Sequence, residues 1–217
     1  MEELIMLKRR PKPKPTRTFE SLCILVLAGS GSMQELGSQH LSKGEKVGLA
    51  IHDMFVILKE SRYAPCFDFA IVNYDHRSII KMYPTPLKQI NPDSDFNPSL
   101  GLGGGSFVSE GLRQAKSIAQ NYLSQRCDGG LSRFVTILMM SDGMDSSPSR
   151  TMAICDELKQ MENVMVYGVF VETMGADIRL LEERCKFMKN LCSYPDSYFT
   201  SVLDAEILTN FIIKSWS

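Results

Sequence analysis

The most prominent pattern in the chain is an unbroken apolar run, Leu22 to Ala28, that stops at a cluster of glycines and serines. A run of this length is typical of a strand that helices cover on both faces. Phe134 to Met140 and Val164 to Val171 are two further runs of this kind, and a short strand is expected near Tyr198 to Val202. The pattern therefore predicts a sheet with a buried centre.

Segments with apolar residues three and four positions apart separate these runs and predict amphipathic helices. The first helix is expected within Glu35 to Ser61, and another after Ser147, which can cap it. The last helix is expected to be capped by Asp204. The predicted buried faces are Leu49, Phe55 and Leu58; Val108, Leu112, Ala115, Ala119 and Tyr122; Met152, Cys155, Leu158 and Met161; Ile178, Leu181, Cys185 and Met188; and Leu208, Phe211 and Ile212.

One pair of strands breaks the alternation of strand and helix. Phe67 to Tyr74 and Ser78 to Tyr83 are joined by a three-residue polar turn, which predicts an antiparallel hairpin ended by Pro84 and Pro86. The expected fold class is therefore α/β, with a doubly wound, mostly parallel sheet, one antiparallel edge strand and helices on both faces.

Length and composition suit one domain, because 217 residues of which 44% are apolar can form a single sizeable core. We assign this domain to residues 18–217, and residues 1–17 to a flexible basic arm, extended or disordered, in which Lys and Pro alternate. The formal net charge of -1 gives no reason to expect nucleic acid or a membrane as partner. No apolar run approaches the roughly 20 residues of a membrane span, and the charged N-terminus is unlike a secretory signal. A cytoplasmic location is therefore expected.

The six cysteines lie in apolar segments without a C-x-x-C pair, which indicates reduced core thiols rather than a zinc site. The candidate chemistry lies instead in three polar loops, at residues 29–32, at residues 104–106 and at Asp142 with Asp145. All three should meet at the carboxyl edge of the sheet, where open α/β sheets bind ligands. Hydroxyl and carboxylate oxygens suit a hard cation such as Mg²⁺, Mn²⁺ or Ca²⁺.

These loops resemble the metal-ion-dependent adhesion site of the von Willebrand factor A family, which uses a D-x-S-x-S loop, a second-loop Thr or Ser and a third-loop Asp. The resemblance runs from about Phe19 to the C-terminus and includes the hairpin with its T-P-L turn, Phe69 to Leu87. It implies that the metal leaves one position for a carboxylate of a partner protein. The residues that match the family's ligands are Ser30, Ser32, Ser106 and Asp142.

Ala28 is the departure from that pattern, because the family has its first Asp at this position. A methyl group cannot coordinate a cation, so Mg²⁺ binding should be weak or absent in this chain. Asp145 could substitute in part, or could serve as a turn residue or helix cap. Two explanations stay open: a single Asp-to-Ala change in a metal-binding parent, or a natural domain that binds partners without metal.

The resemblance implies a non-enzymatic interaction module, a scaffold or regulator that binds a partner offering an acidic residue. Intracellular bacterial members of the family act beside kinases, phosphatases, ATPases or defence proteins, so a defence or stress-response system is expected. The alternatives are a metal-assisted hydrolase or phosphoryl-transfer enzyme and a metal-independent structural subunit. A dinucleotide site lacks its third glycine, a hydrolase elbow would read G-x-S-x-G rather than A-x-S-x-S, and no G-K-S or G-K-T supports a phosphate loop.

Overall fold

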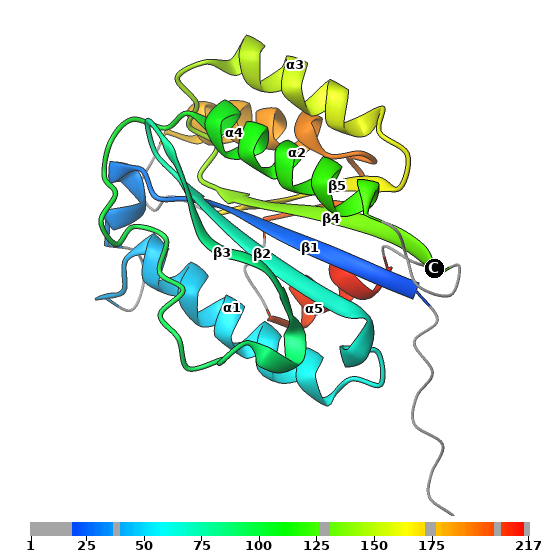
Figure 1. The fold of residues 1–217 in the computed structure, drawn as a ribbon. Helices are drawn as coiled ribbons and strands as arrows, with labels where there is room; N and C mark the ends of the chain where they lie inside the picture. The colour runs from blue at the N-terminus through cyan, green and yellow to red at the C-terminus, as the bar shows by residue number, and fades with distance from the viewer. Residues whose placement is uncertain (1–18, 37–39, 126–130, 172–176, 202–204, 215–217) are drawn as a thin grey trace, which may run out of the picture.

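The computed structural model describes residues 19–36, 40–125, 131–171, 177–201 and 205–214, and it contains one six-stranded sheet (Figure 1). The strands lie in the order β3-β2-β1-β4-β5-β6, and every neighbouring pair is parallel except β2 with β3. The strand bounds are Phe19–Ala28 (β1), Phe67–Tyr74 (β2), Ser78–Pro86 (β3), Ser132–Ser141 (β4), Val164–Phe170 (β5) and Phe199–Thr200 (β6).

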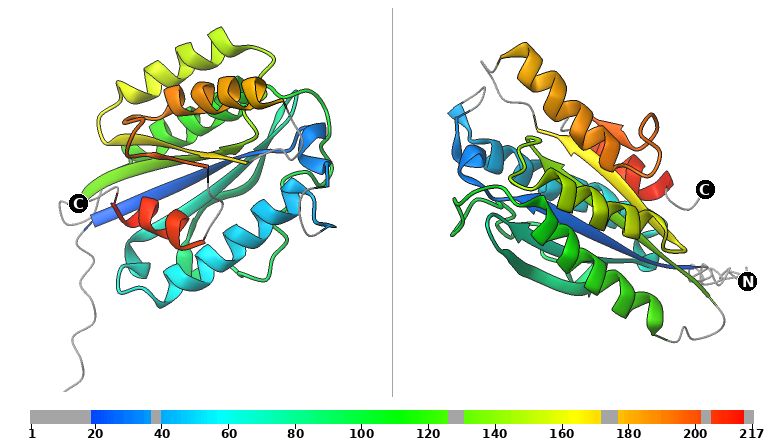
Figure 2. Two further views of the ribbon diagram at one scale, coloured as in Figure 1. Left: turned by 180° about the vertical axis from the view of Figure 1, so that it is seen from behind. Right: turned by 90° about the horizontal axis from the view of Figure 1, so that it is seen from above.

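Helices cover both faces of the sheet, with α1 and α5 on one face and α2, α3 and α4 on the other (Figures 1 and 2). All residues from Leu22 to Ala28 are fully buried between these layers, as expected for a central strand. The predicted fold class is confirmed. The helix bounds are Lys43–Glu60 (α1), Val108–Ser124 (α2), Pro148–Lys159 (α3), Ile178–Leu191 (α4) and Ala205–Lys214 (α5).

The first helix differs from its prediction in both start and phase. It begins at Lys43 rather than near Glu35, because Ser42 and Glu45 form a reciprocal capping box that fixes the first turn. Leu49 is exposed instead of buried, since a residue two positions before Ile51 points to the other side of a helix. The residues that face the core are Val47, Ile51, Met54, Phe55 and Leu58.

Three local predictions are wrong. The edge strand β3 continues through Pro84 to Pro86, because an edge strand has a free side on which proline breaks no ladder bond. Ser147 is the N-cap residue of α3 but its side chain makes no capping bond, and Ile178 in the first turn of α4 is exposed. Asp204, the side chain of Ile212, Cys127 and the basic arm lie outside the described residues.

The strand order also fixes where a ligand can bind. The central strand β1 has β2 on one side and β4 on the other. The first strands are thus added to one side of β1 and the later ones to its other side, so the strand order reverses between β1 and β4. At such a switch point the loops after neighbouring strands part and leave a crevice at the carboxyl edge. The loops after β1 and β4 and the loop before α2 lie here, at the left of Figure 1. Within the described part, no helix has the length and apolar character needed to cross a bilayer.

Candidate functional site

The first loop leaves the sheet at Ala28 and is held tightly against its neighbours. The backbone N–H of Gly29 donates to the carbonyl of Tyr74, at 2.7 Å between N and O. No side chain would fit at Gly29, where a Cβ would lie 2.5 Å from atoms of Pro98 and Leu102. Beyond it the Oγ atoms of Ser30 and Ser32 lie 3.1 Å apart and bond to each other.

The second loop, rich in glycine, is fixed by a carboxylate that sequence analysis assigned only to a turn. Asp75 accepts hydrogen bonds from the backbone N–H groups of Gly104 at 3.2 Å and Gly103 at 3.4 Å. Burial raises the pKa of the Asp75 carboxyl, but bonds from the backbone of Arg77, Gly104 and Gly103 outweigh it and hold the pKa below its usual range. The N–H of Gly31 donates to the Gly104 carbonyl at 3.1 Å, which joins the first two loops.

The third loop is bonded to the second through both backbone and side chains. The Ser106 hydroxyl donates to the Met144 carbonyl at 2.6 Å, and the Ser146 N–H donates to the Ser106 carbonyl at 2.7 Å. Asp145 Oδ1 accepts from the N–H groups of Val108 at 3.3 Å and Ser147 at 3.2 Å. Asp145 therefore ties the starts of α2 and α3 together.

Asp142 forms the central ion pair of the site, with a lysine that sequence analysis did not identify. Its side chain is 0% exposed, and its Oδ2 lies 3.3 Å from Nζ of Lys43, which is itself 3% exposed. The same ammonium lies 3.0 Å from Oε2 of Glu35 at the surface. Asp142 Oδ1 accepts from the N–H of Met144 at 3.3 Å, so both of its carboxylate oxygens have partners.

One sequence signal could have pointed to Lys43. It occupies the first position of α1, directly after the capping residue Ser42. A cation is unfavourable there, because the helix dipole places partial positive charge at the N-terminus. Nearby carboxylates offset this unfavourable interaction, and Glu35 and Asp142 lie close enough to do so.

The residues present do not fit a divalent cation as arranged. Ser30 bonds to Ser32, Ser106 to a carbonyl, and Asp142 to an ammonium. The oxygen atoms of the four predicted ligands are thus each bonded to another group of the protein. Among the described residues, no three His, Cys, Asp or Glu side chains form a group that could hold a metal. Tyr74 lies beside Ala28 in the register of β1 and β2, but burial raises the pKa of its hydroxyl and keeps it neutral. A neutral phenol would not replace the carboxylate that the family has at the position of Ala28.

Three exposed apolar side chains belong to these loops or lie next to them in the chain. Leu36 is 71% exposed, Leu100 53% and Met144 40%. Leu36 follows the first loop, Leu100 precedes the glycine-rich loop and Met144 belongs to the third. We refer to Leu36, Leu100 and Met144 as the apolar rim.

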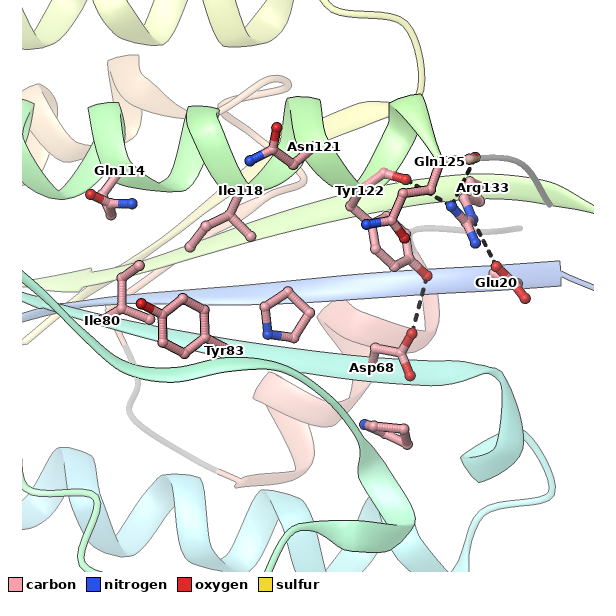
Figure 3. Close-up of a pocket in the computed structure, with 12 residues that line it drawn as sticks. Glu20, Asp68, Ile80, Tyr83, Gln114, Ile118, Asn121, Tyr122, Gln125 and Arg133 are labelled. Atoms are coloured by element: carbon pink, nitrogen blue, oxygen red, sulfur yellow. Dashed lines mark hydrogen bonds and ion pairs between the residues drawn. The ribbon is translucent and has the colours of Figure 1, made fainter.

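A groove of about 560 Å³ lies at the opposite edge of the sheet, between α2 and β3 (Figure 3). Sequence analysis did not predict it. Its three charged side chains are engaged within the protein: Arg133 Nε donates to Glu20 Oε2 at 2.7 Å, and the Tyr122 hydroxyl donates to Asp68 Oδ2 at 3.4 Å. These contacts join the amino ends of β1, β2 and β4 to α2 and give Glu20, Asp68 and Arg133 a structural role.

No protein-family model and no curated sequence relative matches the chain. Several solved structures share its fold. The pilus adhesin SpaC of Lactobacillus rhamnosus GG, in an open conformation, matches with a TM-score of 0.69 and 12% identity over 94% of this chain and 30% of its own. BatB of Bacteroides thetaiotaomicron matches with a TM-score of 0.56 and 16% identity over 90% of this chain and 98% of its own. The PilB minor pilin of Streptococcus sanguinis matches with a TM-score of 0.64 and 12% identity over 92% of this chain and 61% of its own. The chain thus spans under a third of the adhesin, and the likeness supports a von Willebrand factor A-like fold.

Proposed function

We propose that the chain is a protein-interaction module of the von Willebrand factor A type, which binds a partner protein with the carboxyl edge of its sheet. The observation that carries the proposal is a set of three loops bonded to one another, with the exposed residues of the apolar rim in them or next to them in the chain. Exposed apolar side chains at such an edge are typical of protein contact sites. Loops that are already bonded to one another add to this, because binding then orders little chain.

The chemistry of the loops favours binding over catalysis. The hydroxyls of Ser30, Ser32 and Ser106 bond to each other or to a carbonyl, and not to a base that could activate them as nucleophiles. A metal-assisted hydrolase would in addition need a cation that the donor set does not fit. The expected cytoplasmic location and a kinase, phosphatase or ATPase as partner in a bacterial defence or stress-response system remain part of the proposal.

Site-specific photo-crosslinking in cells of the source organism tests the proposed face. A crosslinking amino acid replaces Leu36 or Met144, and as control it replaces Tyr194, which is 57% exposed at the other edge of the sheet. We expect both rim positions to capture the same protein and the control position not to capture it. The purified partner should then bind the wild-type chain, and Leu36→Glu should weaken binding at least tenfold. Capture that is equal from Tyr194, or absent from both rim positions, would contradict the proposal.

A further inference from the structure

We infer that the ammonium group of Lys43 stands in for the divalent cation of this type of site, so that the three loops are assembled without metal. The inference concerns the same face as the proposed function and rests on it only for the conclusion that partner binding needs no metal. It starts from two features of the site, the Lys43–Asp142 ion pair and Ala28. Relative to the family's pattern, Ala28 removes one negative charge, and the ammonium supplies one positive charge where a divalent ion would supply two.

Asp142 requires a positive charge beside it. A carboxylate that is 0% exposed has lost its hydration, and among the described residues Asp142 accepts only one backbone hydrogen bond, so the neighbouring cation supplies most of what offsets that loss. In a metal site with two carboxylates a divalent ion does this. With Ala28 at the position of the family's first carboxylate, Asp142 is the carboxylate of that ligand pattern that remains, and the single charge of the Lys43 ammonium balances it. Asp75, which is also buried, accepts hydrogen bonds from backbone N–H groups instead.

The position of Lys43 is built into the fold rather than left to a flexible side chain. The Ser42–Glu45 capping box fixes the first turn of α1, and the backbone N–H of Lys43 donates to the Glu35 carbonyl at 3.2 Å. Glu35 also accepts from the ammonium at 3.0 Å and so holds it from the solvent side. Two carboxylates, one buried and one at the surface, therefore anchor a side chain that is 3% exposed.

This arrangement distinguishes the two origins of Ala28 considered above. In a metal-binding parent, the Lys43 ammonium would lie beside the divalent ion that Asp142 helps to hold, and the two positive charges would repel each other in a poorly solvated site. In a domain that works without metal, the same lysine is required. Lys43 therefore favours a natural metal-free site over a single Asp-to-Ala change in a metal-binding protein.

Binding of Mn²⁺ to the full chain tests the inference without reference to any partner. Four forms are compared by electron paramagnetic resonance of free Mn²⁺ and by calorimetry: wild type, Ala28→Asp, Lys43→Met and the double variant. We expect uptake only in the double variant, which regains a carboxylate and loses the competing ammonium. Uptake by the wild type, or uptake by Ala28→Asp equal to that of the double variant, would overturn the inference.

A second measurement keeps the inference testable if the double variant does not fold. Amine acetylation of the native wild-type chain, followed by peptide mass spectrometry, compares Lys43 with the exposed Lys81 and Lys88. We expect Lys43 to react at least tenfold more slowly, at a rate that neither Mg²⁺ nor EDTA changes. Reaction at the rate of Lys81, or protection only when Mg²⁺ is present, would refute a fixed ammonium.

The two proposals fail separately. If crosslinking at the rim captures no partner while Mn²⁺ uptake and acetylation behave as expected, the proposed function is wrong and the fixed ammonium stands. If a partner is captured but its binding is abolished by EDTA, the interaction face is right and the role of Lys43 is wrong.

Discussion

Breaking the Lys43–Asp142 ion pair should destabilise the chain strongly, and far more than breaking the Lys43–Glu35 pair at the surface. We consider Lys43→Met, which keeps the length and volume of the aliphatic stem but removes the charge. Asp142 is then left with one hydrogen bond, from the N–H of Met144, and with no counter-charge. Removing one partner of a buried pair costs about 3–5 kcal/mol, because the remaining charge is desolvated without compensation. At about 2–4 °C per kcal/mol for a chain of this size, the melting temperature should fall by roughly 6–20 °C.

Glu35→Gln provides the matched control, because it removes the other carboxylate partner of the same ammonium. Glu35 is 58% exposed, so water replaces much of what it contributes, and the expected cost is only about 0–1 kcal/mol. Asp142→Asn completes a double-mutant cycle with Lys43→Met. The double variant should be more stable than the sum of the two single losses predicts, by roughly 0.5–3 kcal/mol.

The assay is reversible urea unfolding followed by circular dichroism, with calorimetry for the melting temperature. The loss in Lys43→Met should change little between low and moderate salt, because screening acts weakly on a pair that solvent does not reach. A loss no larger than that of Glu35→Gln, together with a coupling of zero in the cycle, would show that the ammonium is not buried against Asp142. The stability argument and the metal-free site would then both lose their basis.

Three further predictions concern other parts of the fold. Gly111→Ala should lower the free energy of unfolding, measured with urea, by about 1–3 kcal/mol, because the added Cβ would lie 2.7 Å from Tyr74 Cδ1. As the control, Ser117→Ala at an exposed position of the same helix should raise that free energy by at most about 0.5 kcal/mol. The pKa of Asp75 is lowered in the folded chain, so its carboxylate should stabilise the fold at pH values above the pKa of an unfolded Asp. That contribution should disappear as the pH falls through the pKa of Asp75 in the folded chain. In acid unfolding, the stability of Asp75→Asn should therefore fall less steeply over this range than that of the wild type. In native iodoacetamide labelling read by mass spectrometry, Cys185 should react before the four buried described cysteines, and equal rates would contradict their burial.

Much of the architecture could be predicted because it depends on local patterns. The apolar run at Leu22–Ala28 can be buried on both faces only in the centre of a covered sheet, and it forms β1. The three- and four-residue spacing from Val108 to Tyr122 defines the buried face of α2, since only a helix gathers those positions on one side. Prediction was weakest at element boundaries, as at the start of α1, where a capping box rather than apolar spacing decides.

The sequence by itself determined the sheet, its antiparallel edge and the gathering of three polar loops at one edge, because strand patterns and topology follow from short-range periodicity. Through the family resemblance it also led to the expectation that Ala28 leaves the site without one carboxylate. Only the tertiary structure showed which cation lies beside Asp142. Lys43 and Asp142 are 99 positions apart and meet because α1 begins beside the end of β4. No local pattern encodes such a contact, and the burial that makes the pair energetically decisive exists only once the loops are packed together.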